Sequence, residues 1–514
     1  MLAVDHVYVA MFGGLPGKPT GLAMSVLRRA EAFSEAGITT EMLVDHFYPD
    51  FDLQMQELKD RGRIGEAISV RYLYHDLAGE SVYGEDVGYA SPLGTSGWEY
   101  KPIQGNPDVL MGKLDGEYRQ RVLLRGERVL FIDHLDNGQW VSRAWHDVAG
   151  AVCKVEQMGS TGRARTIEFI DRAGNCYLEQ LLEEESQRVI GCELFPRSPR
   201  SRACRNMVEV FQFWLQSMVL VGDPAPIIIS EYGVRRVALE ALEQENNACV
   251  IYTIHNSHLR PPYHYGSDVR PEMADLLGHL DRYHGAVVLT EEQRQDIFKQ
   301  YGWLDSVHVI PHFVPSTSQG SERDAMKVVM VGRFDRIKGQ TSAIRAFSRV
   351  VQMVPAAKLV FYGRGSEEEA MRQQILDLGL EDSVSIAGFT ANATGVFQGA
   401  SMSIVASDYE GFCLSLAESM AAGCIPVSYD IKYGPREMVQ NGINGFLVQP
   451  GNVKEMADAI ILGLSNPARA GIMSKKAMKI QDTLSKQRFM EEWKTVLSLS
   501  VAARDSRSNM AQPR

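Results

Sequence analysis

The sequence predicts an α/β protein of two doubly wound domains, with an antiparallel β-sheet domain inserted into the first. Three observations predict this. The 514 residues exceed what one ordinary core holds, apolar runs alternate with helical patterns at both ends of the chain, and a stretch of runs joined directly by turns interrupts the first half. The predicted boundaries are 1–67 with 201–320 for the first domain, 68–200 for the insertion, 321–485 for the second domain, 486–503 for a closing helix and 504–514 for a disordered tail.

The first domain opens with a strand at 4–12, a glycine-rich loop at 13–21, a helix at 22–37 and a second strand at 38–45. This order is typical of a β-α-β unit, in which the strands are parallel and helices cover the sheet. The same rhythm resumes after the insertion. We expect helices at 203–221, 233–244 and 272–283, and strands at 226–230, 248–255 and 285–290.

The insertion consists of short runs of alternating apolar residues, such as "RVLFID" and "RTIEFID". The runs are separated by "LRGER", "LDNGQ" and "DRAGN", which contain the Asn-Gly and Ala-Gly pairs of tight turns. Strands joined so closely must run antiparallel. We therefore predict a β-meander over residues 68–200.

The second domain begins near Ala325 with "AMKVVMVGRFD", a strand and its loop. Further strands are expected at 357–365, 384–389, 402–407, 425–430 and 445–451, with helices between them. Ligands of such domains bind at the carboxyl ends of the parallel strands. The motifs that follow strands are therefore the candidates for a site.

Composition limits the partners and the compartment. A net charge of −11 argues against nucleic acid as a partner. Seven dispersed cysteines without a C-x-x-C pair are typical of reduced cytoplasmic thiols. The first residues lack the basic region of a signal peptide, and the longest apolar stretch is broken by polar residues and a Gly-Asp-Pro turn. We expect no transmembrane segment and a cytoplasmic location.

The loop "VGRFDRIKG" places Arg333 and Lys338 after a buried strand. A guanidinium and an ammonium at one strand end can neutralise the diphosphate of a nucleotide sugar. They would also favour the transition state, because negative charge grows on the diphosphate as the sugar leaves. The alternative for such a pair alone is a solvated basic loop.

Two carboxylates, Glu410 and Glu418, lie around the start of a small, apolar helix. We expect that helix to begin near Phe412, with free amides and the positive end of its dipole facing the site. Seven helical residues span about 10 Å, which matches the separation between the hydroxyls of a hexose and those of a ribose. The alternative is one acid favouring the dipole and another facing solvent.

The other candidate motifs are weaker. Gly13 and Gly14 follow the first strand and would let backbone amides approach a diphosphate. His255 and His258, in "YTIHNSH", end a buried strand. Asp50–Asp52 imitates a D-x-D metal motif, which we interpret as a solvated loop, and we expect no metal.

"VGRFDRIKGQ", "EGFCLSLAESMAAG" and "YDIKYGPREMVQNGINGFLV" resemble the carboxyl-terminal domain of retaining GT-B glycosyltransferases of family 4. The insertion, the glycine loop and "TIHNSH" are similar to the branch with wall teichoic acid α-glycosyltransferases and serine-rich-adhesin O-glycosyltransferases. This resemblance implies a GT-B fold of two Rossmann-like domains and transfer of glucose or N-acetylglucosamine from a UDP-sugar, without cofactor or metal.

The resemblance also implies roles for individual residues. Glu410 would contact the donor hexose, Glu418 the ribose, and His255 would lie near the transferring sugar. The catalytic set is then Glu410, His255, Arg333 and Lys338. The donor-binding set is Gly13, Gly14, Arg333, Lys338, Glu410, Gly411, Phe412, Cys413, Leu414 and Glu418, and the acceptor-facing set is Asn256, His258 and Arg260.

The sequence does not identify the acceptor, which could be a polyol-phosphate polymer, a protein serine or threonine, or a small molecule. Related transferases use the inserted domain for self-association or for docking a partner and acceptor, so we expect a homo-oligomer. A location at the inner membrane face is compatible with such an acceptor. The alternatives are a non-catalytic partner subunit of a glycosyltransferase complex and a GT-B sugar-nucleotide epimerase or hydrolase.

Overall fold

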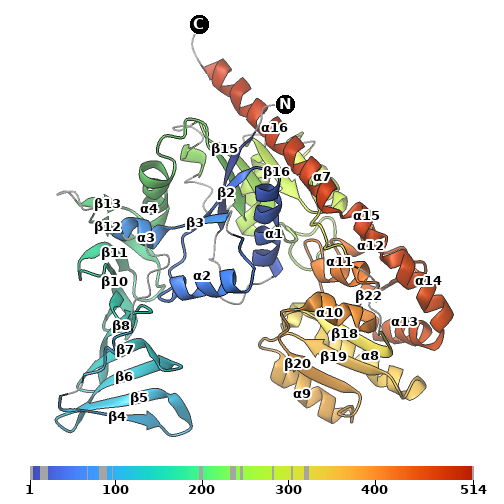
Figure 1. Cartoon of the computed structure of the whole chain (residues 1–514), viewed down its shortest axis with the longest axis horizontal. Helices are drawn as coiled ribbons and strands as arrows, with labels where there is room; N and C mark the ends of the chain where they lie inside the picture. Colours follow the sequence, from blue (N-terminus) through green and yellow to red (C-terminus); the bar gives the residue numbers. More distant parts are fainter. Residues whose placement is uncertain are drawn as a thin grey trace. The chain divides into compact units, whose positions relative to one another are not determined.

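A computed structural model describes most of the chain, as two compact units (Figure 1). The N-terminal unit comprises Asp5–Ser230 with Val234–Val250, and the C-terminal unit comprises Ile251–Arg514 with Met1–Val4 and Glu231–Gly233. The described residues are 4–11, 21–65, 68–79, 89–94, 96–195, 201–231, 239–242, 247–280, 283–302, 305–317 and 323–511.

The N-terminal unit contains parallel strands in the order β3-β2-β1-β14. These are β1 (His6–Met11), β2 (Thr39–Val44), β3 (Ile68–Tyr72) and β14 (Ile227–Glu231). Their helical elements are α1 (Gly21–Glu35), α2 (Phe51–Asp60), α3 (Leu73–Ala78), α4 (Met207–Trp214) and the π-helix η1 (Leu215–Val219). The predicted β-α-β opening is present, with α1 between β1 and β2.

The antiparallel sheet begins later than the predicted residue 68. Strand β3 pairs in parallel with β2, with Thr40 opposite Ile68, so it belongs to the parallel sheet. The cause is α2, which carries the chain back to the start of the sheet as a parallel crossover requires. The helix α2 also corrects our interpretation of Asp50–Asp52 as a solvated loop, since these residues form its start.

Ten antiparallel strands follow in strict chain order, which confirms the predicted meander. They are β4 (Trp98–Ile103), β5 (Asn106–Leu114), β6 (Glu117–Arg125), β7 (Arg128–Asp136), β8 (Gln139–His146), β9 (Val152–Met158), β10 (Ala164–Ile170), β11 (Cys176–Leu182), β12 (Val189–Leu194) and β13 (Arg202–Cys204). Two-residue turns such as Asp115-Gly116 and Asn137-Gly138 join neighbouring strands, and all four residues have positive φ. Asn, Asp and Gly adopt that conformation at little cost.

One face of this sheet contains a buried ion cluster. Asp133 on β7 is 1% exposed and pairs with Arg121 Nη2 at 2.8 Å and Arg143 Nε at 2.6 Å.

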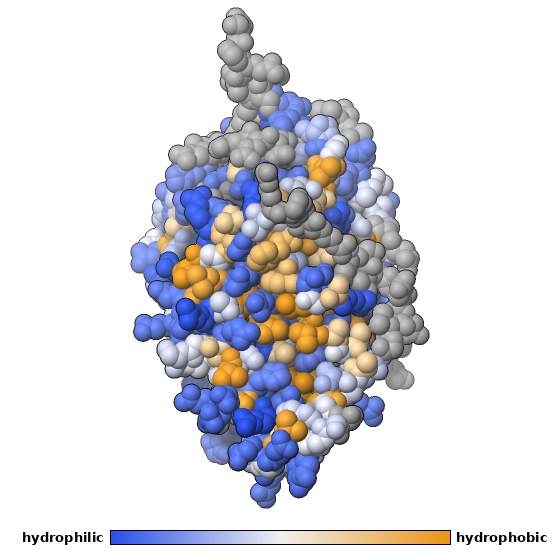
Figure 2. Space-filling model, turned by 90° about the vertical axis from the view of Figure 1, so that its left-hand side faces the viewer, coloured by the Kyte–Doolittle hydropathy of each residue, from blue (hydrophilic) through white to orange (hydrophobic). Residues whose placement is uncertain are grey.

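Figure 2, viewed from the side of β10 and β11, shows apolar side chains gathered among hydrophilic ones. Large apolar residues of the sheet that are more than a third exposed include Ile103, Trp140, Val141, Val152, Leu181 and Ile190.

The C-terminal unit contains two groups of parallel strands. One is β15 (Cys249–Ile254), β16 (Gly285–Val288) and β17 (Val307–Val309), with helices α6 (Pro271–Gly278) and α7 (Glu291–Tyr301). The other is a six-stranded sheet in the order β20-β19-β18-β21-β22-β23, whose pairs are all parallel. Its strands are β18 (Asp324–Val331), β19 (Lys358–Tyr362), β20 (Val384–Gly388), β21 (Ala400–Val405), β22 (Ile425–Tyr429) and β23 (Phe446–Val448).

Helices cover this six-stranded sheet, as expected where β21 and β22 are buried along their whole length. They are α8 (Gln340–Met353), α9 (Glu368–Asp377), α10 (Ala393–Gln398), α11 (Leu414–Ala421), α12 (Pro435–Met438), α13 (Val453–Ser465), α14 (Pro467–Ala477) and α15 (Ile480–Thr483). A 3₁₀ turn, η3 (Arg336–Lys338), precedes α8. None of the helices among the described residues combines the length and apolar character needed to cross a membrane.

The closing helix is longer than predicted. Helix α16 (Lys486–Ala511) continues through the first eight residues of the tail that we expected to be disordered (Figure 1). No glycine or proline interrupts residues 486–511, and the next helix-breaking residue is Pro513. Buried Trp493 and Leu497 attach the helix, and Ser500 Oγ lies 2.7 Å from where a Cβ on Gly285 would be, at the start of β16.

Candidate active site

The loop after β18 positions Lys338. Asp335 begins the 3₁₀ turn by accepting a hydrogen bond from the Ile337 amide at 2.9 Å. Gly339 follows at φ 70°, and a Cβ there would overlap the carbonyl oxygen of Ala406. This close approach places Lys338 beside the segment that follows β21.

Lys338 and Glu410, both predicted donor-site residues, form an ion pair. Lys338 Nζ lies 2.6 Å from Glu410 Oε1, and the side chains are 27% and 14% exposed. Ser407 Oγ donates to the same oxygen at 2.7 Å. Burial by itself lowers the pKa of Lys338, but the charge and hydrogen bond of Glu410 outweigh it, and the net effect raises that pKa. The Lys338 side chain is therefore charged at neutral pH.

Arg333 lies on the same loop but is not part of this pair. Its guanidinium is 67% exposed and contacts Asp335 at 2.9 Å. Its carbonyl accepts a hydrogen bond from Gln340 Nε2 at 2.6 Å, which fixes the backbone. The exposed side chain is available to a ligand at the end of β18.

Gly411 allows the segment that follows β21 to lie against the segment that follows β15. A Cβ at this position would overlap the carbonyl oxygen of His255, so only glycine permits the observed approach. The predicted neighbours Glu410 and His255 are therefore close in the chain's fold.

Helix α11 begins two residues later than predicted. Leu414 is its first residue, and Cys413 precedes it in the left-handed conformation at φ 72°. Phe412 is buried and lies outside the helix. Burial raises the pKa of the Cys413 thiol far above its ordinary value, so that thiol stays neutral.

Glu418 is half-buried and lies within α11. The separation of about 10 Å expected between Glu410 and Glu418 assumed continuous helix from Phe412, and this assumption is wrong because the helix starts at Leu414. The assignment of Glu418 to a ribose stays a prediction.

His255, at the end of β15, is held by residues that sequence reasoning missed. Its Nε2 donates to Glu231 Oε2, and Thr253 Oγ1 donates to the same oxygen at 2.5 Å. The His255 ring stacks on His312 with centroids 5.6 Å apart, and His312 meets the ring of Phe412 edge-on. A signal for Glu231 existed, because it follows the apolar run 226–230 as His255 follows the run 248–254.

The three residues predicted to face an acceptor are in different environments. His258 is fully buried, stacks on Tyr433 and contacts Gln300 Oε1 at 3.0 Å, so the prediction that it faces an acceptor is wrong. Burial lowers its pKa. Asn256 is half-buried, and its carbonyl accepts from Gln293 Nε2 at 2.8 Å. Arg260 is exposed.

The glycine-rich loop that was predicted to contact the diphosphate is not described by the structure. Gly13 and Gly14 lie outside the described residues. Among the residues that are described, no group of three or more His, Cys, Asp and Glu side chains has the arrangement of a metal site.

Residues 316–480 match the family model for glycosyl transferases group 1. The chain carries a glycosyltransferase group 1 domain. Arg333, Lys338, Glu410 and Glu418 all lie inside this domain, whereas Glu231 and His255 lie before it.

Two curated relatives of this chain are named for transfer to polyol-phosphate polymers. It is 24% identical over 99% of its length to the poly(glycerol-phosphate) alpha-glucosyltransferase of Bacillus subtilis and covers 77% of that protein. It is 29% identical over 42% of its length to the poly(ribitol-phosphate) alpha-N-acetylglucosaminyltransferase of Staphylococcus aureus and covers 44% of that protein.

Solved structures confirm the predicted GT-B fold. A mutant of S. aureus TarM, in complex with fondaparinux, alpha-GlcNAc-glycerol and UDP, superposes with a TM-score of 0.83 at 18% identity, over 96% of this chain and 99% of that one. The pneumococcal O-GlcNAc transferase GtfA, in complex with UDP and GlcNAc, superposes with a TM-score of 0.78 at 17% identity and the same two coverages.

Proposed function

We propose that this chain is a retaining hexosyltransferase that moves glucose or N-acetylglucosamine from a UDP-sugar to a hydroxyl of a polyol-phosphate polymer. The observation that carries the proposal is the Lys338–Glu410 pair inside the group 1 domain, next to Gly411, which lies against the backbone of His255. The named activities of the curated relatives support the donor and acceptor classes.

The cations of the β18 loop would bind the diphosphate of the donor. Lys338 keeps its charge because Glu410 balances it, and Arg333 presents an exposed guanidinium. A hydrogen bond to a charged group contributes roughly 1.5–3 kcal/mol. The same contacts strengthen as negative charge develops on the departing UDP.

Glu410 would accept a hydrogen bond from the donor hexose. Lys338 and Ser407 both contact its Oε1, and no hydrogen bond or ion pair from the described residues reaches its Oε2. The second oxygen is thus available to a sugar hydroxyl. Glu418, farther along α11, would bind the ribose.

The reaction forms a bond between the acceptor oxygen and the anomeric carbon and breaks the bond from that carbon to the UDP oxygen. The acceptor proton passes to the leaving phosphate on the same face of the sugar, which retains the anomeric configuration. The carboxylate of Glu231 fixes the His255 ring at this strand end. His255 would thereby orient the sugar that is transferred.

A polyol-phosphate acceptor is favoured over a protein because the relative that matches 99% of this chain is named for such a polymer. Arg260, exposed after β15, would meet its phosphates. A peptide acceptor is the competing possibility, since GtfA subunits of streptococci also match, at 24% identity over 64% of this chain in Streptococcus gordonii.

We also propose self-association through the inserted sheet. No strand among the described residues pairs with the outer edge of β4, and open edges pair with other chains unless they are blocked. Light scattering of the full chain would test this, with an oligomer expected and a monomer contradicting it. The seven cysteines, none of them in a disulfide, support a cytoplasmic location.

The test is donor turnover followed by acceptor screening. UDP release from UDP-glucose or UDP-N-acetylglucosamine should rise with poly(glycerol phosphate) and much less with a serine-rich peptide. A non-catalytic subunit would release no UDP from either donor, and an epimerase would change the sugar without releasing UDP. Either result would overturn the proposal.

A further inference from the structure

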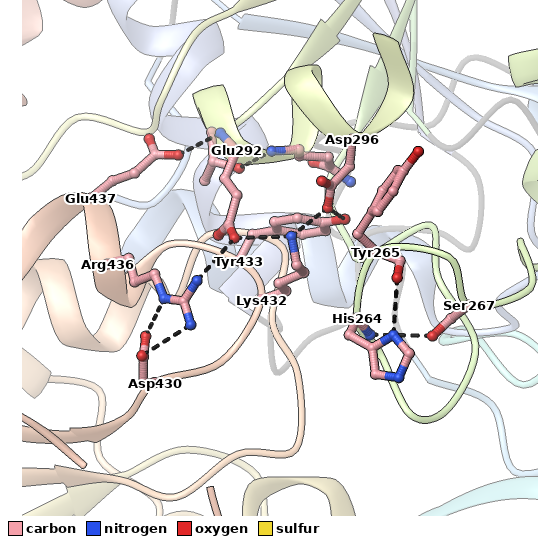
Figure 3. A network of polar contacts seen from close by, with 12 residues as sticks. His264, Tyr265, Ser267, Glu292, Asp296, Asp430, Lys432, Tyr433, Arg436 and Glu437 are labelled. Atoms are coloured by element: carbon pink, nitrogen blue, oxygen red, sulfur yellow. Dashed lines mark hydrogen bonds and ion pairs between the residues drawn. The ribbon is translucent and has the colours of Figure 1, made fainter. Parts of the chain in front are cut away.

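Asp296 is a buried carboxylate on α7 that receives two donors at one oxygen. It is 1% exposed, and Lys432 Nζ and Tyr433 OH lie 2.5 Å and 2.9 Å from its Oδ2 (Figure 3). Burial, reinforced by the charge of Asp296, raises the pKa of Tyr433, so its hydroxyl stays protonated and donates. The buried ring of His258 stacks on Tyr433, with centroids 5.9 Å apart. Side chains from two distant parts of the sequence thus converge on one oxygen.

The same two donors hold Glu410 through the backbone. The Glu410 amide donates to the Lys432 carbonyl at 2.9 Å, and the Tyr433 amide donates to the Glu410 carbonyl at 2.8 Å. Gly434 follows at φ 108°, where a Cβ would overlap the carbonyl oxygen of Phe412. The segment that Asp296 anchors therefore lies directly along the backbone of the donor-site carboxylate.

Side-chain contacts around Asp296 keep this segment in one place. Lys432 also pairs with Glu292 at 2.9 Å, and the carboxylate of Glu437 accepts hydrogen bonds from the amides of Glu291 and Glu292, the first residues of α7 (Figure 3). Lys432 pairs with both Asp296 and Glu292, and its side chain is 16% exposed. A charge that is largely removed from water is costly unless it is paired, so the two carboxylates hold the Lys432 ammonium in place.

We propose that Asp296 is a positioning residue for the reaction: by fixing Lys432 and Tyr433, it sets the place of Glu410 relative to the donor hexose. The inference rests on the proposed function, because it gives Asp296 a role through Glu410. It links α7, which lies outside the group 1 domain, to the carboxylate that lies inside it. Asp296 itself does not touch the substrate.

Asp296 is connected to Glu410 through only two residues, Lys432 and Tyr433, so a small shift of these residues would move Glu410. A displacement of about 1 Å in a reacting geometry can lower a rate by about 100-fold. Removal of the Asp296 charge leaves Lys432 with Glu292 as its remaining carboxylate partner and weakens the anchor of the backbone that Glu410 pairs with. UDP contacts supplied by the β18 loop would not change, because no contact of Asp296 reaches that loop among the described residues.

The decisive variant is Asp296→Asn, which keeps the size of the side chain and removes its charge. We expect kcat for UDP release to fall by about 100-fold, with the Kd for UDP within about threefold of the unaltered chain. Asp296→Glu, which keeps the charge, should recover part of this decrease. Lys432→Met and Tyr433→Phe should lower kcat in the same direction.

Asp133→Asn is the matched control. Asp133 is equally buried, has two arginine partners and belongs to the inserted sheet of the other unit. This substitution should lower the melting temperature without lowering the rate of UDP release from the donor. A merely structural role for Asp296 predicts that both variants behave alike.

A double variant separates positioning from general destabilisation. If Asp296 acts through Glu410, adding Asp296→Asn to Glu410→Gln should lower kcat by less than about threefold, since coupled residues give non-additive effects. A full further decrease, or an Asp296→Asn variant with normal kcat, would overturn the inference. An unaltered chain that releases no UDP would instead overturn the proposed function, so the two failures are distinguishable.

Discussion

Glu410→Gln isolates the carboxylate charge of the donor site without changing the shape of the side chain. Glu410 Oε1 accepts hydrogen bonds from Lys338 Nζ at 2.6 Å and Ser407 Oγ at 2.7 Å. An interaction with a charged acceptor contributes roughly 1.5–3 kcal/mol, and every 1.36 kcal/mol corresponds to about a tenfold change in rate. The hydrogen bond from the hexose to this carboxylate is the one that acts during transfer, so its weakening should lower kcat by about 10- to 150-fold.

The same substitution should leave nucleotide binding nearly unchanged, because we propose that the carboxylate binds the hexose and not UDP. Isothermal titration with UDP, next to steady-state turnover, measures both quantities. The free energy of unfolding should fall by about 1–3 kcal/mol, since Lys338 is left half-buried without its counter-charge. Glu369→Gln, an exposed carboxylate in the first turn of α9, is the control. Near-normal turnover of Glu410→Gln would refute the assignment.

Four further results are expected. Arg333→Ala and Lys338→Ala should both weaken UDP binding, but only the second should lower the melting temperature, because Arg333 is exposed and Lys338 is paired inside; equal effects of the two on melting would contradict this. Gly411→Ala should lower the free energy of unfolding by more than about 1 kcal/mol, because its Cβ would overlap the His255 carbonyl oxygen. An unchanged melting curve would show that the backbone at Gly411 can move away from His255. Burial lowers the pKa of His75 to about 4 from its ordinary 6.5, so between pH 4 and 6.5 this histidine is protonated in the unfolded chain but not in the folded one. The free energy of unfolding, measured with urea, should therefore fall as the pH drops from 6.5 towards 4. A flat pH profile would contradict the burial of His75. Turnover should survive EDTA, because Arg333 and Lys338 supply the positive charge, and a decrease that Mn²⁺ restores would contradict that.

The sequence sufficed where a pattern repeats locally or a turn has fixed chemistry. The β-meander follows from alternation and from pairs such as Asn137-Gly138. Lys338 and Glu410 could be predicted together because each follows a buried parallel strand of one sheet, and such ends meet at one edge. The boundary at 68 was wrong because the short run of β3 has no feature that distinguishes a parallel partner from an antiparallel one.

Long-range contacts were not predictable in the same way. Glu231 and His312 contact His255 from positions 24 and 57 residues away, and nothing local to either marks the pairing. Asp296 lies in a helix rich in polar residues, where its burial cannot be distinguished from the exposure of its neighbours. The tail was misjudged because polar composition outweighed the absence of helix breakers in α16.

The anomeric configuration of the product tests the central claim most directly. Incubation of the chain with UDP-glucose or UDP-N-acetylglucosamine and poly(glycerol phosphate), followed by proton NMR of the polymer, reports both transfer and stereochemistry. We expect α-linked hexose on the acceptor hydroxyls, formed in equal amount to the UDP released. A β-linked product would contradict retention, and a polymer without hexose despite bound UDP-sugar would contradict the proposed transferase activity towards this acceptor.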